Sequence, residues 1–110
     1  MDGVTPRTMT LGPASCHIGL ADIGLRADLA DKLREITSVR VPESERGKGW
    51  GTALMNYVTT AADRHAVALL LEVKSEGAMS DAQLERFYER FGFQRFQSEP
   101  CVLMVRVPRQ

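Results

Sequence analysis

Three glycines at alternate positions, Gly47, Gly49 and Gly51, stand beside two basic residues, Arg46 and Lys48. Glycine has no Cβ, so the backbone can turn tightly at such positions and direct successive amide groups toward one point. Where a loop of this kind leads into a helix, the unpaired N–H groups of the first turn and the positive end of the helix dipole attract an anion. The pattern therefore favours a phosphate or diphosphate site, with the two basic side chains at its rim.

The same spacing argues against two other phosphate-binding motifs. A P-loop requires a lysine followed by serine or threonine, whereas Lys48 is followed by Gly49. The dinucleotide-binding fingerprint places its third glycine later in the loop, and no acidic residue follows at a position suited to a ribose. A plain strand-to-helix turn remains the alternative explanation for the glycines, so the flanking elements must decide.

The residues on either side of the loop have the periodicities of a strand and a helix. Residues 35–41 are rich in β-branched side chains, and Pro42 ends the run. After the loop, apolar residues recur at intervals of three and four from Ala53 to His65, as in an amphipathic helix. The loop thus lies between a strand and a helix N-terminus, which is the setting that an anion site requires.

Farther along the chain, strand and helix patterns alternate again. Residues 66–73 form a nearly continuous apolar run, which is typical of a strand in the middle of a sheet. Ser80 and Gln83 fit a capping box, and the apolar helical face that follows continues to Gly92, which favours a helix end. Two closing strands are predicted, at residues 93–96 and 101–107.

The pattern before residue 35 is weaker. Residues 14–20 fit a short strand, whereas residues 21–34 are ambiguous between strand and helix. Residues 1–13 are rich in Thr, Gly and Pro, which suggests a loosely ordered lead-in.

Length and composition indicate a single compact domain that spans residues 1–110, with 44% hydrophobic and 25% charged residues. With the strand and helix patterns above, we expect an α/β domain. Fourteen basic residues balance fourteen acidic ones, so no net charge attracts nucleic acid or an anionic membrane. No segment reaches the roughly 18 consecutive apolar residues of a membrane span, and we expect a cytoplasmic protein. Cys16 and Cys101 fit no metal-ligand spacing, and we expect both to behave as small hydrophobes and the protein to hold no metal.

Two segments, residues 39–54 (VRVPESERGKGWGTAL) and 84–93 (LERFYERFGF), resemble the GCN5-related N-acetyltransferase (GNAT) superfamily. The family signature Arg/Gln-x-x-Gly-x-Gly/Ala after a strand is matched by Arg46, Gly49 and Gly51. The second segment is similar to the family helix that ends in Tyr-x-x-x-Gly-Phe. The resemblance covers residues 35–107 and implies a mixed, mostly antiparallel sheet that splays open where acetyl-CoA inserts.

The resemblance also implies roles for individual residues. The strand before the loop would offer its backbone to the pantetheine arm of acetyl-CoA, and the loop amides would hold the pyrophosphate. The cofactor-binding residues implied in this way are Val39, Arg40, Val41, Arg46, Gly47, Lys48, Gly49, Trp50, Gly51 and Thr52.

Transfer of an acetyl group to an amine requires the amine to lose a proton, because an ordinary alkylamine with a pKa of about 10.4 is mostly charged at neutral pH. In the histone-acetylating branch of the family a glutamate base occupies a place similar to that of Glu35, and Glu72 is the reserve candidate. The family pattern assigns protonation of the departing CoA thiolate to Tyr88. The structural alternatives are a solvated carboxylate for Glu35 and a core tyrosine for Tyr88.

Two departures from the family pattern bear on ligand binding. Asp81 is the nearest counterpart of an asparagine that many relatives carry near the start of the last helix, where it usually contacts the cofactor. Relatives normally have two helices between their first strands, and residues 1–34 are too short to hold them comfortably. We hypothesise that the acceptor site is open to a protein chain or is completed by a second subunit of a homodimer.

The function predicted on these grounds is direct transfer of acetyl from acetyl-CoA to a primary amine, carried by a small molecule or a protein. A covalent acyl-enzyme is not expected, because neither cysteine is placed to carry the acyl group. The alternative is a non-catalytic acyl-CoA-binding or protein-interaction module. A weaker alternative is nucleic-acid binding through Arg40, Arg46 and Lys48, whose affinity would fall steeply with salt.

Overall fold

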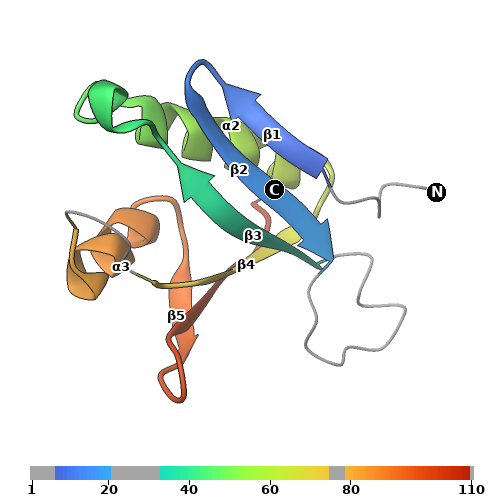
Figure 1. Cartoon of the computed structure of the whole chain (residues 1–110). Coiled ribbons are helices and arrows are strands. Elements are labelled where there is room, and N and C mark those ends of the chain that lie inside the picture. Colours follow the sequence, from blue (N-terminus) through green and yellow to red (C-terminus); the bar gives the residue numbers. More distant parts are fainter. Residues whose placement is uncertain (1–6, 21–32, 75–78, 110) are drawn as a thin grey trace.

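The computed structural model describes residues 7–20, 33–74 and 79–109, and it contains one six-stranded sheet (Figure 1). The order of strands across the sheet is β1-β2-β3-β4-β6-β5. In chain order the strands are β1 (Arg7–Leu11), β2 (Ala14–Leu20), β3 (Leu33–Arg40), β4 (Ala68–Glu72), β5 (Gln94–Gln97) and β6 (Leu103–Arg106). Every neighbouring pair is antiparallel except β3 and β4, which are parallel. The predicted mixed, mostly antiparallel sheet is confirmed.

Strands β3 and β4 pair only over part of their length. Their register runs from Leu33 opposite Ala68 to Ile36 opposite Leu71. Strand β3 then continues to Arg40 without pairing with β4, and Figure 1 shows the two strands spreading apart toward their C-terminal ends. The point of separation after Ile36 and Leu71 is called the fork below.

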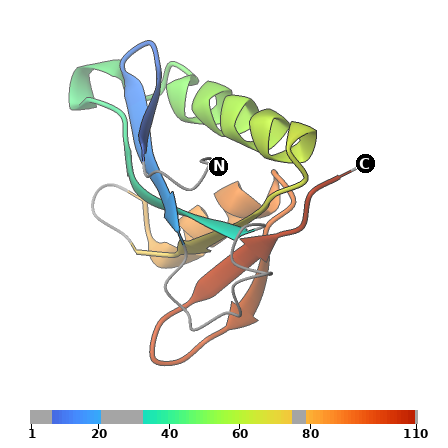
Figure 2. The ribbon, with the colours of Figure 1, turned by 90° about the vertical axis from the view of Figure 1, so that its right-hand side faces the viewer.

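Two helices cover one face of this sheet, and Figure 2 shows the longer one, α2 (Trp50–Arg64), along one side of the twisted strands. Helix α3 (Asp81–Glu89) follows β4, and a short 3-10 helix, η1 (Glu43–Glu45), precedes the glycine loop. Both longer helices contribute to one hydrophobic core with the sheet residues Cys16, Ile36 and Leu71. Residues that alternate with these along the strands therefore lie on the opposite face.

The predicted ends of α3 agree with the structure. The Ser80 hydroxyl accepts a hydrogen bond from the Gln83 amide, and the Gln83 side chain accepts one from the Ser80 amide, so the capping box is confirmed. Gly92, with φ +98°, follows the helix end. A Cβ at this position would lie 2.6 Å from the Arg109 guanidinium, the far end of a side chain that can move, so it is the positive φ that favours glycine here.

The expectation of a loosely ordered lead-in is wrong for residues 7–11, which form β1 and pair with β2. Met9 is buried whereas Thr8 and Thr10 are exposed, so the strand alternates over too short a span to be distinguished from a loop by composition. Residues 1–6 and 21–32, which were also assigned to a lead-in and an ambiguous segment, lie outside the described residues. The other predicted elements are present with ends shifted by up to three residues.

An ion pair that the sequence pattern does not reveal joins the end of α2 to β6. Both terminal nitrogens of Arg106 donate to the Asp63 carboxylate, at 2.8 and 2.9 Å, and its Nε donates to the Phe91 carbonyl at 2.6 Å. The Arg106 side chain is only 3% exposed. These hydrogen bonds, with a further one from the Arg109 amide, lower the pKa of Asp63 to about 2. The pair fixes α2 against the sheet and so fixes the loop at the other end of the helix.

Candidate functional site

The glycine loop adopts a backbone conformation that only glycine accepts readily. Gly47 and Gly49 have φ values of +81° and +87°, and Gly49 is the N-cap of α2. A Cβ built at either position meets nothing within 4 Å, so these glycines are required by conformation and not by crowding. Gly51 differs, because its Cβ would point toward the Phe87 ring at 3.7 Å, which is ordinary contact.

The amide groups of residues 47–52 donate no hydrogen bond within the described part of the chain. Before the loop, the Arg46 amide donates to the Glu43 carbonyl, and after it the next donor is the Ala53 amide, which reaches the Gly49 carbonyl at 3.0 Å. No side chain caps the N-terminus of α2. A continuous run of N–H groups is therefore left at the positive end of a 15-residue helix, which is the arrangement that binds phosphate groups.

Side chains around the loop tie it to the segments on either side of it. Arg46 Nε donates to the Val41 carbonyl at 3.0 Å. One oxygen of Glu45 accepts hydrogen bonds from Trp50 Nε1, at 3.2 Å, and from Lys48 Nζ, at 3.5 Å. Both charged side chains at the rim thus have local partners, which leaves the backbone of the loop as its main open binding surface.

The Trp50 ring packs against the turn between β1 and β2. A Cβ at Gly12, whose φ is +57°, would lie 2.4 Å from the ring, so the turn and the indole are in direct contact. The Trp50 side chain therefore faces the protein, while its amide belongs to the open run. Neither Gly12 nor Glu45 was expected at the site, because no spacing rule connects them with Trp50.

Strand β3 carries an irregularity directly after the fork. Its register with β2 places Thr37 opposite His17 and Arg40 opposite Ser15, so two residues of β3 face Cys16 alone. Such a bulge leaves one residue out of the ladder and bends the strand. On its other side β3 has left β4, so backbone groups of residues 37–40 have no sheet partner there among the residues that the structure describes. The side chains of Val39 and Val41 pack against the core, and Arg40 is exposed.

Tyr88 lies in the core on the helix-covered face, 8% exposed, with its ring edge-on to Phe87 and Phe93. Burial raises the pKa of its phenol, and the nearby Cys16 adds to the effect. The hydroxyl makes no hydrogen bond with the described residues. Because every fully buried side-chain oxygen of those residues has a hydrogen-bond partner, the hydroxyl itself cannot be fully buried. Its oxygen therefore reaches solvent, although the ring is packed. A neutral phenol of this kind can act as a proton donor.

The two glutamates singled out by the sequence lie on the opposite face of the sheet. Glu35 pairs with Gly19 and Leu70, one residue before the fork. Glu72 follows Leu71, the last residue of β4 that pairs with β3. The structure thus places both carboxylates beside the fork on one face of the sheet, and Tyr88 in the core on the other face. Among the described residues no cluster of His, Cys, Asp or Glu could hold a metal ion, and none of their helices is long and apolar enough to cross a membrane.

Comparison with known proteins agrees with this geometry. A family model described as "Acetyltransferase (GNAT) domain" matches residues 14–95. Comparison with curated protein sequences finds no significant match. The solved structure of an anti-CRISPR protein, AcrVA5, is similar with a TM-score of 0.68 and 17% identity, over 91% of this chain and 96% of that one.

Two solved acetyltransferases are similar as well. The ribosomal-protein-S18-alanine N-acetyltransferase from Escherichia coli gives a TM-score of 0.66 at 18% identity, over 89% of this chain and 63% of that one. A GNAT-family acetyltransferase from Staphylococcus aureus gives 0.60 at 12% identity, over 88% and 60%. The chain therefore spans less than two-thirds of the length of these two enzymes, and identities this low support the fold alone. The family match covers most of the chain, including the fork, the glycine loop and Tyr88, and the protein belongs to the GNAT acetyltransferase family.

Proposed function

We propose that this protein transfers an acetyl group from acetyl-CoA directly to a primary amine. The observation that carries the proposal is the run of unpartnered amides at residues 47–52, placed beside two parallel strands that separate. Membership of the acetyltransferase family supports the use of an acyl-CoA.

The loop and the fork suit different parts of one acetyl-CoA molecule. The diphosphate would accept hydrogen bonds from the loop amides at the start of α2. The pantetheine arm, which carries amide groups, would hydrogen-bond to the free backbone edge of residues 37–40 of β3, much as an added strand does. The thioester would then lie at the fork, where the bulge of β3 exposes further backbone groups.

Glu35 is the proposed general base. Its place one residue before the fork, on the face without α2 and α3, lets a carboxylate reach an amine that approaches from that side. Positioned acid–base groups contribute about 10²- to 10⁴-fold to a rate. A Glu35→Gln variant should therefore lose activity on that scale and keep its affinity for acetyl-CoA. Glu89→Gln, an exposed substitution on α3, is the matched control.

Tyr88 is the proposed general acid. The incoming ammonium carries three protons. One stays on the amide product, and one leaves through Glu35 to solvent. The third returns by way of solvent to Tyr88, and so replaces the proton that the phenol gives to the CoA sulfur. The C–N bond forms as the C–S bond breaks. Burial raises the pKa of Tyr88, so it stays protonated at neutral pH and can serve as this donor.

The test is a comparison of Tyr88→Phe with Tyr57→Phe, a control whose ring is 49% exposed. Thiol release from acetyl-CoA is followed with an amine panel, and thermal unfolding verifies that each variant folds. We expect the Tyr88 variant to release thiol at least tenfold more slowly at unchanged acetyl-CoA affinity. Equal rates in the two variants would show that Tyr88 serves only the core.

A non-catalytic acyl-CoA-binding module is the second candidate. It needs only the run of unpartnered amides at residues 47–52 and no acceptor site. Such a module would bind acetyl-CoA in calorimetry but release no thiol with any amine, whereas the proposed enzyme does both.

A further inference from the structure

One carboxylate, that of Glu45, lies at the entrance of the glycine loop. Glu45 is the last residue of η1, and its Oε1 accepts hydrogen bonds from Trp50 Nε1, at 3.2 Å, and from Lys48 Nζ, at 3.5 Å. Trp50 is the first residue of α2, so this contact reaches from the entrance of the loop to the helix that follows it. The carboxylate therefore bridges the segment that carries the open amides.

A carboxylate is an unfavourable neighbour for a diphosphate, because like charges repel. By its charge alone, Glu45 would weaken an anion site. Lys48 offsets that charge only in part, since the two side chains are 59% and 34% exposed for Lys48 and Glu45, and exposed ion pairs contribute little. The position of Glu45 therefore indicates a role that does not depend on its charge.

The Trp50 ring connects Glu45 with the rest of the protein. Its six-membered ring lies against Gly12, where a Cβ would be 2.4 Å away, and Figure 1 shows the start of α2 at the same end of the sheet as the turn between β1 and β2. Indole has one polar hydrogen, and Oε1 of Glu45 is its acceptor. The ring is thus fixed at one edge by the turn and at the other by the carboxylate.

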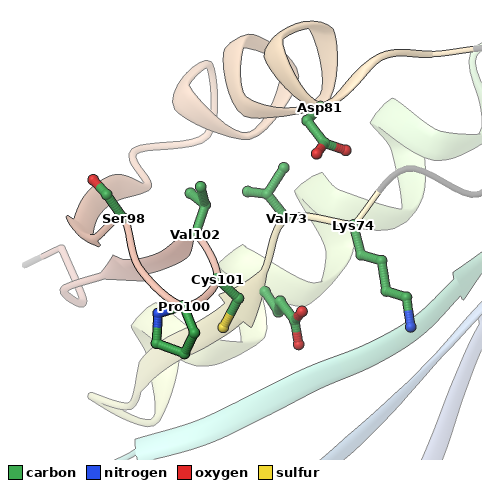
Figure 3. A pocket seen from close by; sticks show the side chains of 8 residues that line it. Val73, Lys74, Asp81, Ser98, Pro100, Cys101 and Val102 are labelled. Atoms are coloured by element: carbon green, nitrogen blue, oxygen red, sulfur yellow. The ribbon is translucent and has the colours of Figure 1, made fainter.

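Two other carboxylates of the site region stand apart from the loop. Glu72 and Asp81 line a cavity of about 460 Å³ at the C-terminal end of β4 (Figure 3), and the described residues that line it belong to neither η1 nor the glycine loop. Within η1 itself, Glu43 is exposed and contributes its backbone carbonyl, which accepts a hydrogen bond from the Arg46 amide. Among the described carboxylates, Glu45 is therefore the one that is bonded to side chains of the loop and the first turn of α2.

We propose that Glu45 is a positioning residue of the acetyl-CoA site and acts through the Trp50 indole. This inference rests on the proposed function. The hydrogen bond from Trp50 Nε1 fixes the first turn of α2 relative to η1, so the amides of residues 47–52 are held in one arrangement before the ligand binds. A loop that is ordered in advance loses less conformational entropy on binding, and this advantage exceeds the repulsion between the carboxylate and the diphosphate.

Two substitutions of Glu45 separate its position from its charge. Glu45→Gln removes the charge and keeps a side-chain oxygen that can accept from Trp50 Nε1, whereas Glu45→Ala removes both. Glu43→Gln and Glu43→Ala are the matched controls, because Glu43 is an exposed glutamate of the same 3-10 helix. Titration calorimetry gives the dissociation constant of coenzyme A for each variant, and thermal unfolding verifies that each variant folds.

We expect Glu45→Gln to bind coenzyme A as tightly as the wild-type protein or up to about fivefold more tightly, because a repelling charge is gone. Glu45→Ala should bind about fivefold or more weakly than the wild-type protein, which corresponds to the loss of one hydrogen bond that orders the loop. The two Glu43 variants should bind alike. Equal dissociation constants in the two Glu45 variants would show that the carboxylate acts by charge alone.

A double substitution tests whether Glu45 acts through the indole. In a Trp50→Phe protein no indole N–H remains, so Glu45→Ala should no longer weaken the binding of coenzyme A. Weakening as large as that in the wild-type background would refute the route through Trp50.

A final readout needs no ligand, because Trp50 is the single tryptophan of the chain. Its indole N–H proton resonance should move upfield in Glu45→Ala and stay near the wild-type position in Glu45→Gln. A resonance that Glu45→Ala leaves unchanged overturns the hydrogen bond. Coenzyme A binding by the wild-type protein, with equal affinities in the two Glu45 variants, overturns the positioning role alone. Absence of binding by the wild-type protein overturns the proposed function as well.

Discussion

The same substitution to alanine should have different effects at two glycines of the loop, weakening ligand binding at Gly49 and raising stability at Gly51. Gly49 has φ +87° and an open environment, whereas a Cβ at Gly51 would point toward the Phe87 ring at 3.7 Å, away from the loop amides. Alanine at Gly49 therefore opposes the backbone conformation of the proposed diphosphate site. Alanine at Gly51 leaves that conformation unchanged and adds a better helix former to the first turn of α2.

The magnitudes follow from the backbone geometry. A non-glycine residue in the left-handed region costs roughly 1–2 kcal/mol, and no steric collision adds to this at Gly49. Because the loop is exposed there, the ligand-free protein can relax and the cost falls on the complex. About 1.4 kcal/mol is a factor of ten, so acetyl-CoA affinity should fall about 5- to 30-fold. Gly51→Ala should stabilise the fold by about 0.5–1 kcal/mol and raise Tm by a few degrees.

Titration calorimetry with acetyl-CoA and thermal unfolding of both variants provide the assay. We expect weaker binding for Gly49→Ala at nearly unchanged Tm, and unchanged binding for Gly51→Ala at a higher Tm. If Gly49→Ala binds acetyl-CoA as tightly as the wild-type protein does, the left-handed turn has no part in ligand binding and the assignment of the loop is refuted.

Two further predictions concern the supports of the site. Asp63→Asn should lower the free energy of unfolding by about 2–3 kcal/mol at pH 7, because it breaks the ion pair with the buried Arg106. The pKa of Asp63, about 2, lies below its ordinary value of 3.8, so the pair stabilises the fold above that ordinary value. The difference in free energy of unfolding between the wild-type protein and Asp63→Asn, measured by urea unfolding, should therefore become smaller as the pH falls below about 4. A difference that stays constant with pH would contradict the assigned ion pair. Gly12→Ala should displace Trp50 and weaken acetyl-CoA binding, at a cost of about 1–3 kcal/mol in stability; an unchanged indole emission spectrum would contradict the contact.

Much of the fold follows from local patterns in the sequence. The Ser80 and Gln83 pair fixed the start of α3, and the apolar run at residues 66–73 predicted a strand inside the sheet. These signals are local, since capping and periodicity depend on neighbours within one or two turns. Strand β1 was missed because five residues with one buried methionine carry too little periodicity, and it is the pairing with β2 that orders them.

The candidate site was predicted in its backbone part and not in its long-range contacts. The glycine spacing indicated the open amides, which the structure contains. Two of these contacts join residues that are 38 or more positions apart: Gly12 with Trp50, and Asp63 in its ion pair with Arg106. No pattern in a single sequence connects such distant residues. The bulge of β3 depends on register with β2, which residues 35–41 do not encode by themselves.

The central claim is that the amides of residues 47–52 bind the diphosphate of the cofactor. Heteronuclear NMR of isotope-labelled protein titrated with coenzyme A tests it most directly, because each amide reports its own hydrogen bonding. We predict that the largest downfield shifts occur at these amides, with Gly47, Gly49 and Gly51 among them. The claim would be contradicted if coenzyme A binds saturably and shifts resonances elsewhere while the amide resonances of residues 47–52 stay unchanged.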